Sequence, residues 1–144
     1  MQVRILLQAK GSEVVTVDPH TSTADVVGVL ADRRIGAVVV SADGRHIEGV
    51  LSERDVVTAL AAHGPDALAE PAHRWMTSPV VTCEPDTTVE WLMATMTERR
   101  IRHVPVLVDG ALAGLVSIGD VVKDHISALE AETKVLHDYI ARPY

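Results

Sequence analysis

The chain has 144 residues, of which 47% are hydrophobic, 23% are charged and 3% are aromatic, and its formal net charge is −7. This balance is that of a folded globular chain rather than a disordered one. The negative charge, with no basic run, disfavours partners such as nucleic acid or an anionic membrane, and the few aromatic residues do not make a stacking platform for single-stranded nucleic acid.

Targeting and metal-binding signals are lacking in the sequence. Residues 1–8 have neither the apolar run nor the cleavage site of a secretory signal, and no apolar stretch is long enough to cross a bilayer. The single cysteine, Cys83, rules out an internal disulfide framework, and the histidines do not have the spacing of metal ligands. We therefore expect a cytoplasmic protein that holds no metal, with Cys83 as a small core residue.

The sequence repeats itself at an offset of 66 residues, which falls to 65 near the end of the repeat. Over residues 14–44 and 48–57, 17 of 41 aligned pairs are identical. The longest matches are Val14–Pro19 with Val80–Pro85, Arg33–Ile35 with Arg99–Ile101, and Gly49–Val56 with Gly114–Val121. Because a unit of this size buries too little surface to be stable alone, we expect the two copies to pack together.

The first copy predicts the order β-α-β-β-α. Valine-rich runs predict strands, Thr21 before an apolar helical pattern predicts a helix start, and an Asp-Gly pair predicts a hairpin turn. The expected elements are a strand at 14–17, a helix from Thr21, a strand at 37–40, a turn at 43–44, a strand at 47–51 and a helix from Ser52.

The second copy predicts the same order. Residues 87–90 read Thr-Thr-Val-Glu, which fits a helix capping box, and the apolar residues that follow recur at helical spacing. The expected elements are a strand at 80–83, a helix from Thr87, a strand at 103–107, a turn at 109–110, a strand at 112–116 and a helix from Ser117.

The predicted fold is therefore α/β (α+β), with two tandem β-α-β-β-α repeats packed with pseudo-twofold symmetry and a C-terminal helix. We place the first repeat at 1–62, a Pro- and Gly-containing connector at 63–76, the second repeat at 77–130 and a C-terminal helical extension at 131–144.

Apolar residues continue at near-heptad spacing beyond the second repeat. They are Val122, Ile126, Leu129, Leu136 and Ile140. This stripe either packs on its own domain or pairs with another chain. Since a helix of this length has more apolar surface than one small module covers, we expect a homodimer to which the C-terminal segment contributes.

The sharpest motif is Gly-φ-φ-Ser-x-x-Asp-Val, where φ is apolar, which occurs at 49–56 and at 114–121. One interpretation is purely structural, because Ser is a preferred N-cap and an acid three residues later completes a capping box. The other is that the helix N-terminus and the Ser hydroxyl bind a phosphate while the Asp accepts hydrogen bonds from a ribose diol. The two interpretations are compatible, since capping satisfies only some of the N–H groups.

With these motifs, the chain resembles a tandem pair of CBS domains, the module named after cystathionine β-synthase, of the stand-alone bacterial type. The segments 80–89 and 101–106 are also typical of that family, and the resemblance covers about residues 1–130. It implies two clefts between the repeats that bind adenosine-containing ligands such as AMP, ADP, ATP, NAD or S-adenosylmethionine. It also implies that pairs associate into larger assemblies.

The resemblance implies a set of ligand-binding residues in each copy. For the second copy these are Ser117 and Asp120 for phosphate and ribose, Gly119 for close backbone approach, Arg102 and His103 for phosphate, Pro79 and Val80 beside the adenine, and Pro105 in the cleft wall. For the first copy they are Ser52 and Asp55 for phosphate and ribose, and Val14 beside the base.

The first copy departs from the second at two places. Gly36 and Ala37 replace Arg102 and His103, and Arg54 replaces Gly119. We therefore expect a ligand to occupy the second cleft. For Arg54 three roles are open: a contact in its own cleft, a contact in the neighbouring cleft or a contact with a dimer partner. For His103, a solvated strand-end position is an equally good interpretation.

We therefore expect a non-catalytic regulatory or sensor module that binds a small adenosine-containing ligand. The alternative is a ligand-independent dimerisation or interaction module that regulates an unknown protein partner. An enzyme is disfavoured, because the sequence offers neither a nucleophile with its base nor a carboxylate cluster for metal.

Overall fold

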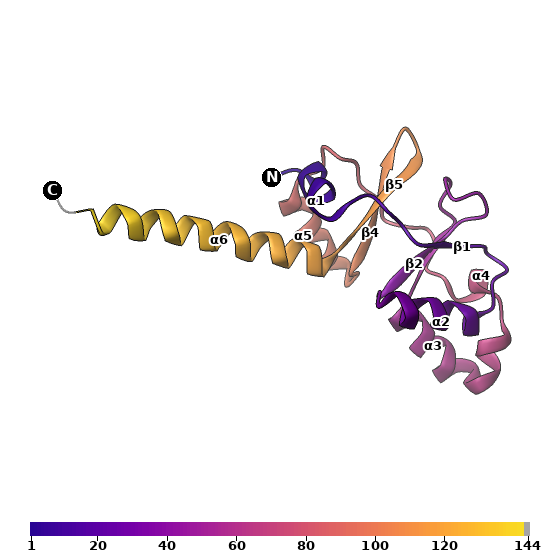
Figure 1. The fold of residues 1–144 in the computed structure, drawn as a ribbon. Helices are drawn as coiled ribbons and strands as arrows, with labels where there is room; N and C mark the ends of the chain where they lie inside the picture. The colour runs from indigo at the N-terminus through magenta and orange to yellow at the C-terminus, as the bar shows by residue number, and fades with distance from the viewer. Residues whose placement is uncertain (143–144) are drawn as a thin grey trace.

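The computed structural model describes residues 1–142. It contains two similar halves and a long terminal helix (Figure 1). In chain order the elements are α1 (Val3–Lys10), β1 (Thr16–Val17), α2 (Thr23–Arg33), β2 (Ala37–Val40), β3 (Gly49–Ser52), α3 (Glu53–His63), the 3₁₀ helix η1 (Gly64–Ala69), α4 (Ala72–Trp75), α5 (Val89–Arg99), β4 (His103–Val108), β5 (Ala111–Ser117) and α6 (Ile118–Ile140).

The strands form one small sheet in each repeat. In the first sheet, in the order β1-β2-β3, β2 pairs in parallel with β1 and antiparallel with β3. The second sheet contains only the antiparallel pair β4-β5. The predicted α/β fold with two tandem repeats and a C-terminal helix is thereby confirmed.

The strand expected at 80–83 is reduced to one isolated bridge between Cys83 and Val106. In the first repeat the N–H of Val39 donates to the carbonyl of Val15 at 3.1 Å. The equivalent residue in the second repeat is Pro105, which has no N–H to donate. The ladder therefore cannot extend past Cys83, although that residue is buried as expected and desolvation raises the pKa of its thiol to about 11.

Two predicted helix starts lie one residue too early. The N-cap of α2 is Ser22 and that of α5 is Thr88, each accepting a hydrogen bond from the backbone N–H three residues on. The hydroxyl of Thr87 instead accepts from the N–H of Glu84, which closes the turn before α5. Thr87–Glu90 thus contains a simple cap rather than the expected capping box.

The two Asp-Gly pairs form different connections. Asp109 and Gly110, with φ values of 50° and 77°, make the predicted two-residue hairpin between β4 and β5. In the first repeat the loop runs from 41 to 48, and the Asp43 carboxylate accepts hydrogen bonds from the N–H groups of Arg45 and His46.

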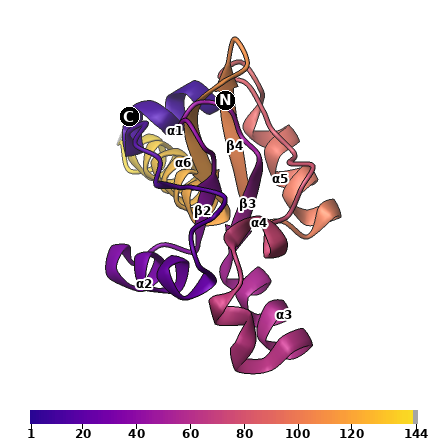
Figure 2. The same cartoon turned by 90° about the vertical axis from the view of Figure 1, so that its right-hand side faces the viewer.

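Each repeat is completed by a segment that precedes the other repeat in the sequence. The helix α1, which the sequence analysis did not predict, places Val3 and Leu6 in the core of the second repeat. The helix α4 lies inside the expected connector, and its Ala72 belongs to the core of the first repeat. Figure 2 shows α1 beside the β4-β5 sheet and α4 near α3.

The glycines that begin the repeated motif are explained by this exchange. A Cβ atom on Gly49 would lie 2.4 Å from Sδ of Met76, and one on Gly114 would lie 2.7 Å from a methyl carbon of Leu7. Both glycines therefore allow an apolar side chain from the added segment to pack against the backbone of the strand.

A third apolar cluster joins the two repeats. Its buried residues Ala37, Val39 and Val50 come from the first sheet. The residues packed against them include Val14 and Val80, at equivalent positions of the two copies.

The helix α6 projects far beyond the two repeats (Figure 1). Val121 in its first turns is buried, whereas Leu129 and Ile140 are exposed. The expected C-terminal extension at 131–144 is thus the continuation of this helix as far as Ile140, and residues 143–144 lie outside the described part of the chain. Within residues 1–142, none of the helices is both long and apolar enough to span a lipid bilayer.

Candidate functional site

A cavity of about 160 Å³ lies between the two repeats. The first repeat contributes Gly36 and residues 52–55 at the start of α3. The second repeat contributes residues 79–81 and residues 100–103, and Thr77 completes the lining. Both repeats are therefore needed to form the cavity.

The first copy of the Ser-x-x-Asp motif is a complete capping box at the edge of this cavity. The carboxylate of Asp55 accepts hydrogen bonds from the N–H of Ser52 at 2.8 Å and from its hydroxyl at 3.0 Å. The hydroxyl of Ser52 accepts in turn from the N–H of Asp55 at 3.4 Å. The structural interpretation of the motif is thus correct.

The capping box leaves little of the helix N-terminus open to a ligand. The N–H of Glu53 donates to the carbonyl of Gly36 at 3.0 Å, and that of Asp55 is capped by Ser52. Among the hydrogen bonds within residues 1–142, none involves the N–H of Arg54. A phosphate would therefore find one backbone donor here, rather than the open helix end that the sequence suggested.

The segment after α4 forms the wall opposite the motif. Thr77 and Val50 exchange two backbone hydrogen bonds, of 2.8 and 3.1 Å, which hold residues 77–80 beside β3. The hydroxyl of Thr77 also donates to the second oxygen of Asp55 at 3.0 Å. After a cis Ser78–Pro79 peptide bond, Pro79 and Val80 add an apolar surface to the cavity.

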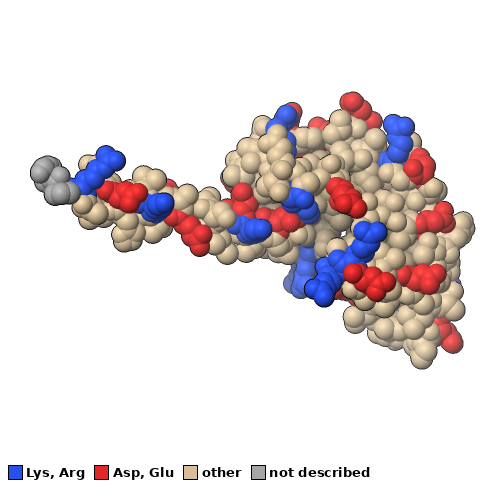
Figure 3. Space-filling view, viewed as in Figure 1, with Lys and Arg blue, Asp and Glu red and all other residues tan. Residues whose placement is uncertain are grey.

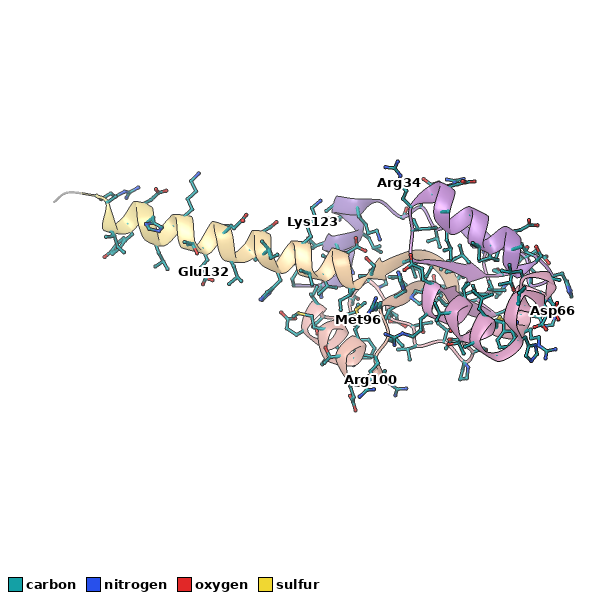
Figure 4. The ribbon with its side chains drawn as sticks, turned by 90° about the horizontal axis from the view of Figure 1, so that it is seen from below. Arg34, Asp66, Met96, Arg100, Lys123 and Glu132 are labelled. Atoms are coloured by element: carbon teal, nitrogen blue, oxygen red, sulfur yellow. The ribbon has the colours of Figure 1, made fainter. Side chains whose placement is uncertain are left out.

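Cationic side chains outnumber anionic ones at the cavity. Arg54, Arg100 and Arg102 line it, against Glu53 and Asp55. A guanidinium nitrogen of Arg54 donates to the carbonyl of Arg100 at 3.2 Å, across the two repeats. Figure 3 shows Lys and Arg side chains gathered where the two halves meet, beside the base of α6, and Figure 4 shows Arg100 at the end of α5. This arrangement favours an anionic group at the cavity mouth.

His103 lies half-buried against the backbone of Gly36. A Cβ atom on Gly36 would lie 3.2 and 3.3 Å from two atoms of the imidazole, so the glycine leaves room for the ring. Burial of the ring lowers the pKa of His103 below its ordinary value of 6.5, an effect that the carboxylate of Glu53 opposes. His103 is therefore a neutral side chain at pH 7 that lines the cavity, and it is not a solvated strand-end residue.

The second copy of the motif has the same capping box but a different neighbour. Asp120 accepts hydrogen bonds from the N–H and hydroxyl of Ser117 at 2.8 and 2.9 Å. The ammonium of Lys10, at the end of α1, donates to Asp120 at 2.6 Å and to the carbonyl of Leu115 at 2.7 Å. Lys10 thus makes the contacts to strand and carboxylate that Thr77 makes in the first copy.

The bound ammonium changes the electrostatics of Asp120. Desolvation opposes ionisation of the carboxyl group, but the hydrogen bonds from Lys10 and Ser117 outweigh it and hold the pKa of Asp120 below its ordinary value of 3.8. Asp120 is therefore a carboxylate already paired with an internal cation, and all of these contacts are made to one of its two oxygens.

The structure groups the expected ligand-binding residues differently from the sequence analysis. Arg102, His103, Pro79 and Val80, which we assigned to the cleft of Ser117 and Asp120, line the cavity of the first copy instead. The residues brought together there are Gly36, Ser52, Arg54, Asp55, Pro79, Val80, Arg102 and His103. Those outside its lining are Val14, Ala37, Pro105, Ser117, Gly119 and Asp120.

The residues outside the lining have other positions. Val14 and Ala37 belong to the apolar cluster between the repeats. Pro105 is buried in β4, where its carbonyl accepts a hydrogen bond from the N–H of Cys83 at 3.0 Å. The second cleft was expected to be occupied because of Arg102 and His103, and these two residues line the cavity beside the motif of the other repeat.

Six lining residues were not among the expected ligand-binding residues: Val50, Glu53, Thr77, Val81, Arg100 and Ile101. Thr77 and Arg100 have no distinguishing sequence pattern, and Glu53 lies at a variable position within the repeated motif. The offset of 66 residues places Arg100 opposite Arg34, so the duplication alone gave no sign that only Arg100 faces the cavity.

Comparison with known proteins identifies relatives of both repeats. A family model described as "CBS domain" matches residues 11–62 and 72–126. The chain is 33% identical over 124 residues to the CBS domain-containing protein CBSX3, mitochondrial, of Arabidopsis thaliana, in a match that covers 83% of this chain and 60% of CBSX3. The chain thus spans about three fifths of the length of that relative.

Solved structures have the same fold. The CBS-domain containing protein ATU1752 from Agrobacterium tumefaciens is 46% identical with a TM-score of 0.84, over 87% of this chain and 99% of that one. The CBS domain pair of MJ0100, solved in complex with 5′-methylthioadenosine and S-adenosyl-L-methionine, is 21% identical with a TM-score of 0.78, over 89% of this chain and 98% of that one.

Proposed function

The chain belongs to the CBS domain family, and we propose that it is a non-catalytic regulatory module that binds one adenine nucleotide in the cavity between its repeats. The observation that carries this proposal is the composition of the cavity, where a carboxylate, an apolar wall and three arginines converge from the two repeats. An adenosine-containing ligand in MJ0100, whose fold is the same, is consistent with it.

Each part of the cavity matches a part of a nucleotide. The apolar surface of Pro79 and Val80 suits the flat adenine base. The carboxylate of Asp55 retains acceptor capacity beyond its contacts with Ser52 and Thr77, which suits a ribose hydroxyl. The guanidinium groups of Arg54 and Arg102 suit the phosphates.

The volume of the cavity restricts how the ligand is held. Drug-sized ligands occupy pockets of roughly 300–1,000 Å³, which is larger than the 160 Å³ found here. We therefore propose that the base and ribose are enclosed, while the phosphates lie at the mouth among the arginines. AMP, ADP, ATP and NAD all have this arrangement of parts, and free adenosine lacks the anionic one.

Binding at this place would link the ligand to the arrangement of the two repeats. The cavity is formed by both, and the Arg54–Arg100 contact crosses between them. A ligand that contacts both sides stabilises the arrangement to which it binds best. This is the basis for proposing a sensor without chemistry of its own, which passes the change to a protein partner.

Thermal unfolding with and without nucleotides tests the proposal. Ligand at 100 times its dissociation constant adds roughly 2.7 kcal/mol to the free energy of unfolding, which is a rise in Tm on the order of 5–10 °C for a chain of this size. We expect AMP, ADP, ATP or NAD to give such a rise, and adenosine to give a smaller one. GTP at the same concentration controls for nonspecific binding of polyphosphate to the arginines.

Two results would contradict the proposal. If no adenosine-containing compound changes the Tm, the alternative of a ligand-independent interaction module is favoured. If the nucleotide is consumed during the measurement, which chromatography of the mixture reveals, the chain is an enzyme.

A further inference from the structure

The exposed face of α6 carries an unbroken heptad pattern. Val122, Leu129 and Leu136 fall at d positions, and Ile126, Thr133 and Ile140 fall at a positions. Five of these six side chains are apolar, and they are 49–79% exposed. An apolar a/d seam sustained over this length is the pattern of a two-stranded coiled coil.

The seam lies to one side of the buried face of the helix. Val121 is buried against the rest of its chain, and the positions of the seam lie about 60–140° from it around the helix, at roughly 100° per residue. Figure 4 shows the side chains of α6 beyond Lys123 extending free of the other elements. A second helix could therefore lie along the seam without meeting the repeats of its own chain.

The residues that flank the seam indicate what covers it. The e and g positions within residues 122–140 are Lys123, His125, Glu130, Glu132, His137 and Tyr139. In a parallel pair of identical helices, g faces the following e of the partner. His125 then faces the partner's Glu130, and Glu132 faces the partner's His137, so that each carboxylate meets an imidazole that can donate a hydrogen bond.

An antiparallel pair of the same length instead brings like charges together beside the seam. With all six a and d layers covered, Glu130 faces the partner's Glu130, and Glu132 faces the partner's Glu132. Like charges at such positions are destabilising. Shifting the helices by one heptad in either direction removes this repulsion but leaves two of the six seam residues of each helix without a partner. The parallel arrangement alone combines the full seam with complementary flanks.

We propose that residues 122–140 of α6 form a parallel two-stranded coiled coil with the same helix of a second copy of this chain. Thr133 is the one polar residue in the seam and meets its own equivalent in the partner. The two pairs of repeats then lie at the same end of the coil, on outward-facing sides. This inference does not depend on nucleotide binding.

Site-specific cross-linking tests the orientation. In a Cys83→Ala background, Leu136→Cys places a thiol in the seam, and a short bismaleimide should link the two copies. In the antiparallel pair with full overlap, the two thiols would be about 15 Å apart along the axis, at about 1.5 Å per residue. We expect Leu136→Cys to be cross-linked at least tenfold faster than Asp138→Cys, whose f position points outward.

A second substitution shows whether the seam holds the copies together. Leu129→Glu added to Leu136→Cys should reduce the cross-linking rate at least tenfold. Val135→Glu, at an outer c position that is 68% exposed, should leave it unchanged. Circular dichroism checks that each variant is folded, which is expected because these side chains are exposed in the single chain.

Three results would overturn the proposal. One is equal cross-linking of the Leu136→Cys and Asp138→Cys variants, which indicates random collision. Another is preferential linking of Leu136→Cys to Ile126→Cys in a mixture, which indicates an antiparallel pair. The third is a chain that stays monomeric at concentrations where the cross-linking is done, which leaves the seam for a different protein.

Discussion

The two copies of the Ser-x-x-Asp motif form the same capping box, but different side chains contact their aspartates. Both form a capping box, with the carboxylate 2.8 Å from the serine N–H. Asp55 then meets the hydroxyl of Thr77 beside a cavity, whereas Asp120 meets the ammonium of Lys10. The comparison teaches that a duplicated motif fixes a local structure, while the residue that arrives from the neighbouring segment decides whether it is available to a ligand.

The comparison makes its strongest prediction at the two aspartates. Asp55→Ala should weaken nucleotide binding about 10- to 100-fold, because a hydrogen bond to a charged group contributes about 1.5–3 kcal/mol. Asp120→Ala should leave nucleotide binding unchanged. Both variants lose a capping box and should be destabilised by about 1 kcal/mol.

Isothermal titration of both variants, together with chemical denaturation, separates the two effects. Equal loss of affinity in the two variants would mean that both copies bind ligand. Unchanged affinity in Asp55→Ala would reduce the motif to a helix cap in both places.

The next prediction concerns the glycine that begins the motif in both copies. Gly49→Ala should destabilise the fold by about 1–3 kcal/mol, because the new Cβ atom would lie 2.4 Å from Sδ of Met76 and 3.0 Å from its Cβ. Gly114→Ala should cost less, because the methyl groups of Leu7 can rotate away. Urea denaturation measures both.

The double variant Gly49→Ala/Met76→Ala is the control for that mechanism. It should be less destabilised than the sum of its two single variants, since the clash is absent without the long side chain. Additive losses would show that the glycine is needed for another reason.

Much of the fold was accessible from the sequence, because it depends on local signals. Ser52 and Ser117 are the N-caps that the motif predicts, and the Asp109–Gly110 hairpin follows from its turn residues. The short helix α1 was missed because eight residues span only about two helical turns, which is too short for a clear periodicity. The lost strand at 80–83 depends on Pro105, whose missing N–H matters only once the partner segment is known.

The site was less accessible, because it depends on which segments meet. Arg102 and His103 were predicted to face a ligand, but the sequence did not reveal that they line a cavity together with Asp55 of the other repeat. Nor did it reveal that Lys10, 110 residues away, reaches Asp120. Offsets within a repeat align equivalent residues, and they contain no information on contacts between the repeats.

A smaller effect on the free energy of unfolding is expected when the ammonium of Lys10 is removed. Lys10→Met should cost about 1 kcal/mol near neutral pH, since it removes a partly buried ion pair. The lowered pKa of Asp120 stabilises the fold above the unfolded-state value near 3.9, and this stabilisation is lost as the pH falls through the lower folded-state value. The stabilities of the variant and the wild type should therefore converge between pH 5 and pH 2.

Denaturation across that pH range measures the convergence, and Lys123→Met, on the exposed face of α6, is the matched control. A difference between Lys10→Met and wild type that stays constant down to pH 2 would show that the ammonium does not act through Asp120.

The smallest effect is expected at the contact of Gly36 with His103. Gly36→Ala would bring a Cβ atom to 3.2 Å from the imidazole and displace the ring by a few tenths of an ångström. Nucleotide affinity should fall about two- to fivefold, which is below 1 kcal/mol, with little change in stability. Gly28→Ala, where a Cβ atom meets nothing within 4 Å, is the control. Unchanged affinity in Gly36→Ala would remove His103 from the ligand site.

The number of nucleotides bound per chain tests the difference between the two copies most directly. Isothermal titration of AMP and ADP into the wild-type protein should give one equivalent per chain, because only the copy beside Thr77 has a carboxylate free of an internal cation. Two equivalents per chain would contradict this, since they would show that the copy beside Lys10 also binds a nucleotide, and so would a titration with no binding of either nucleotide.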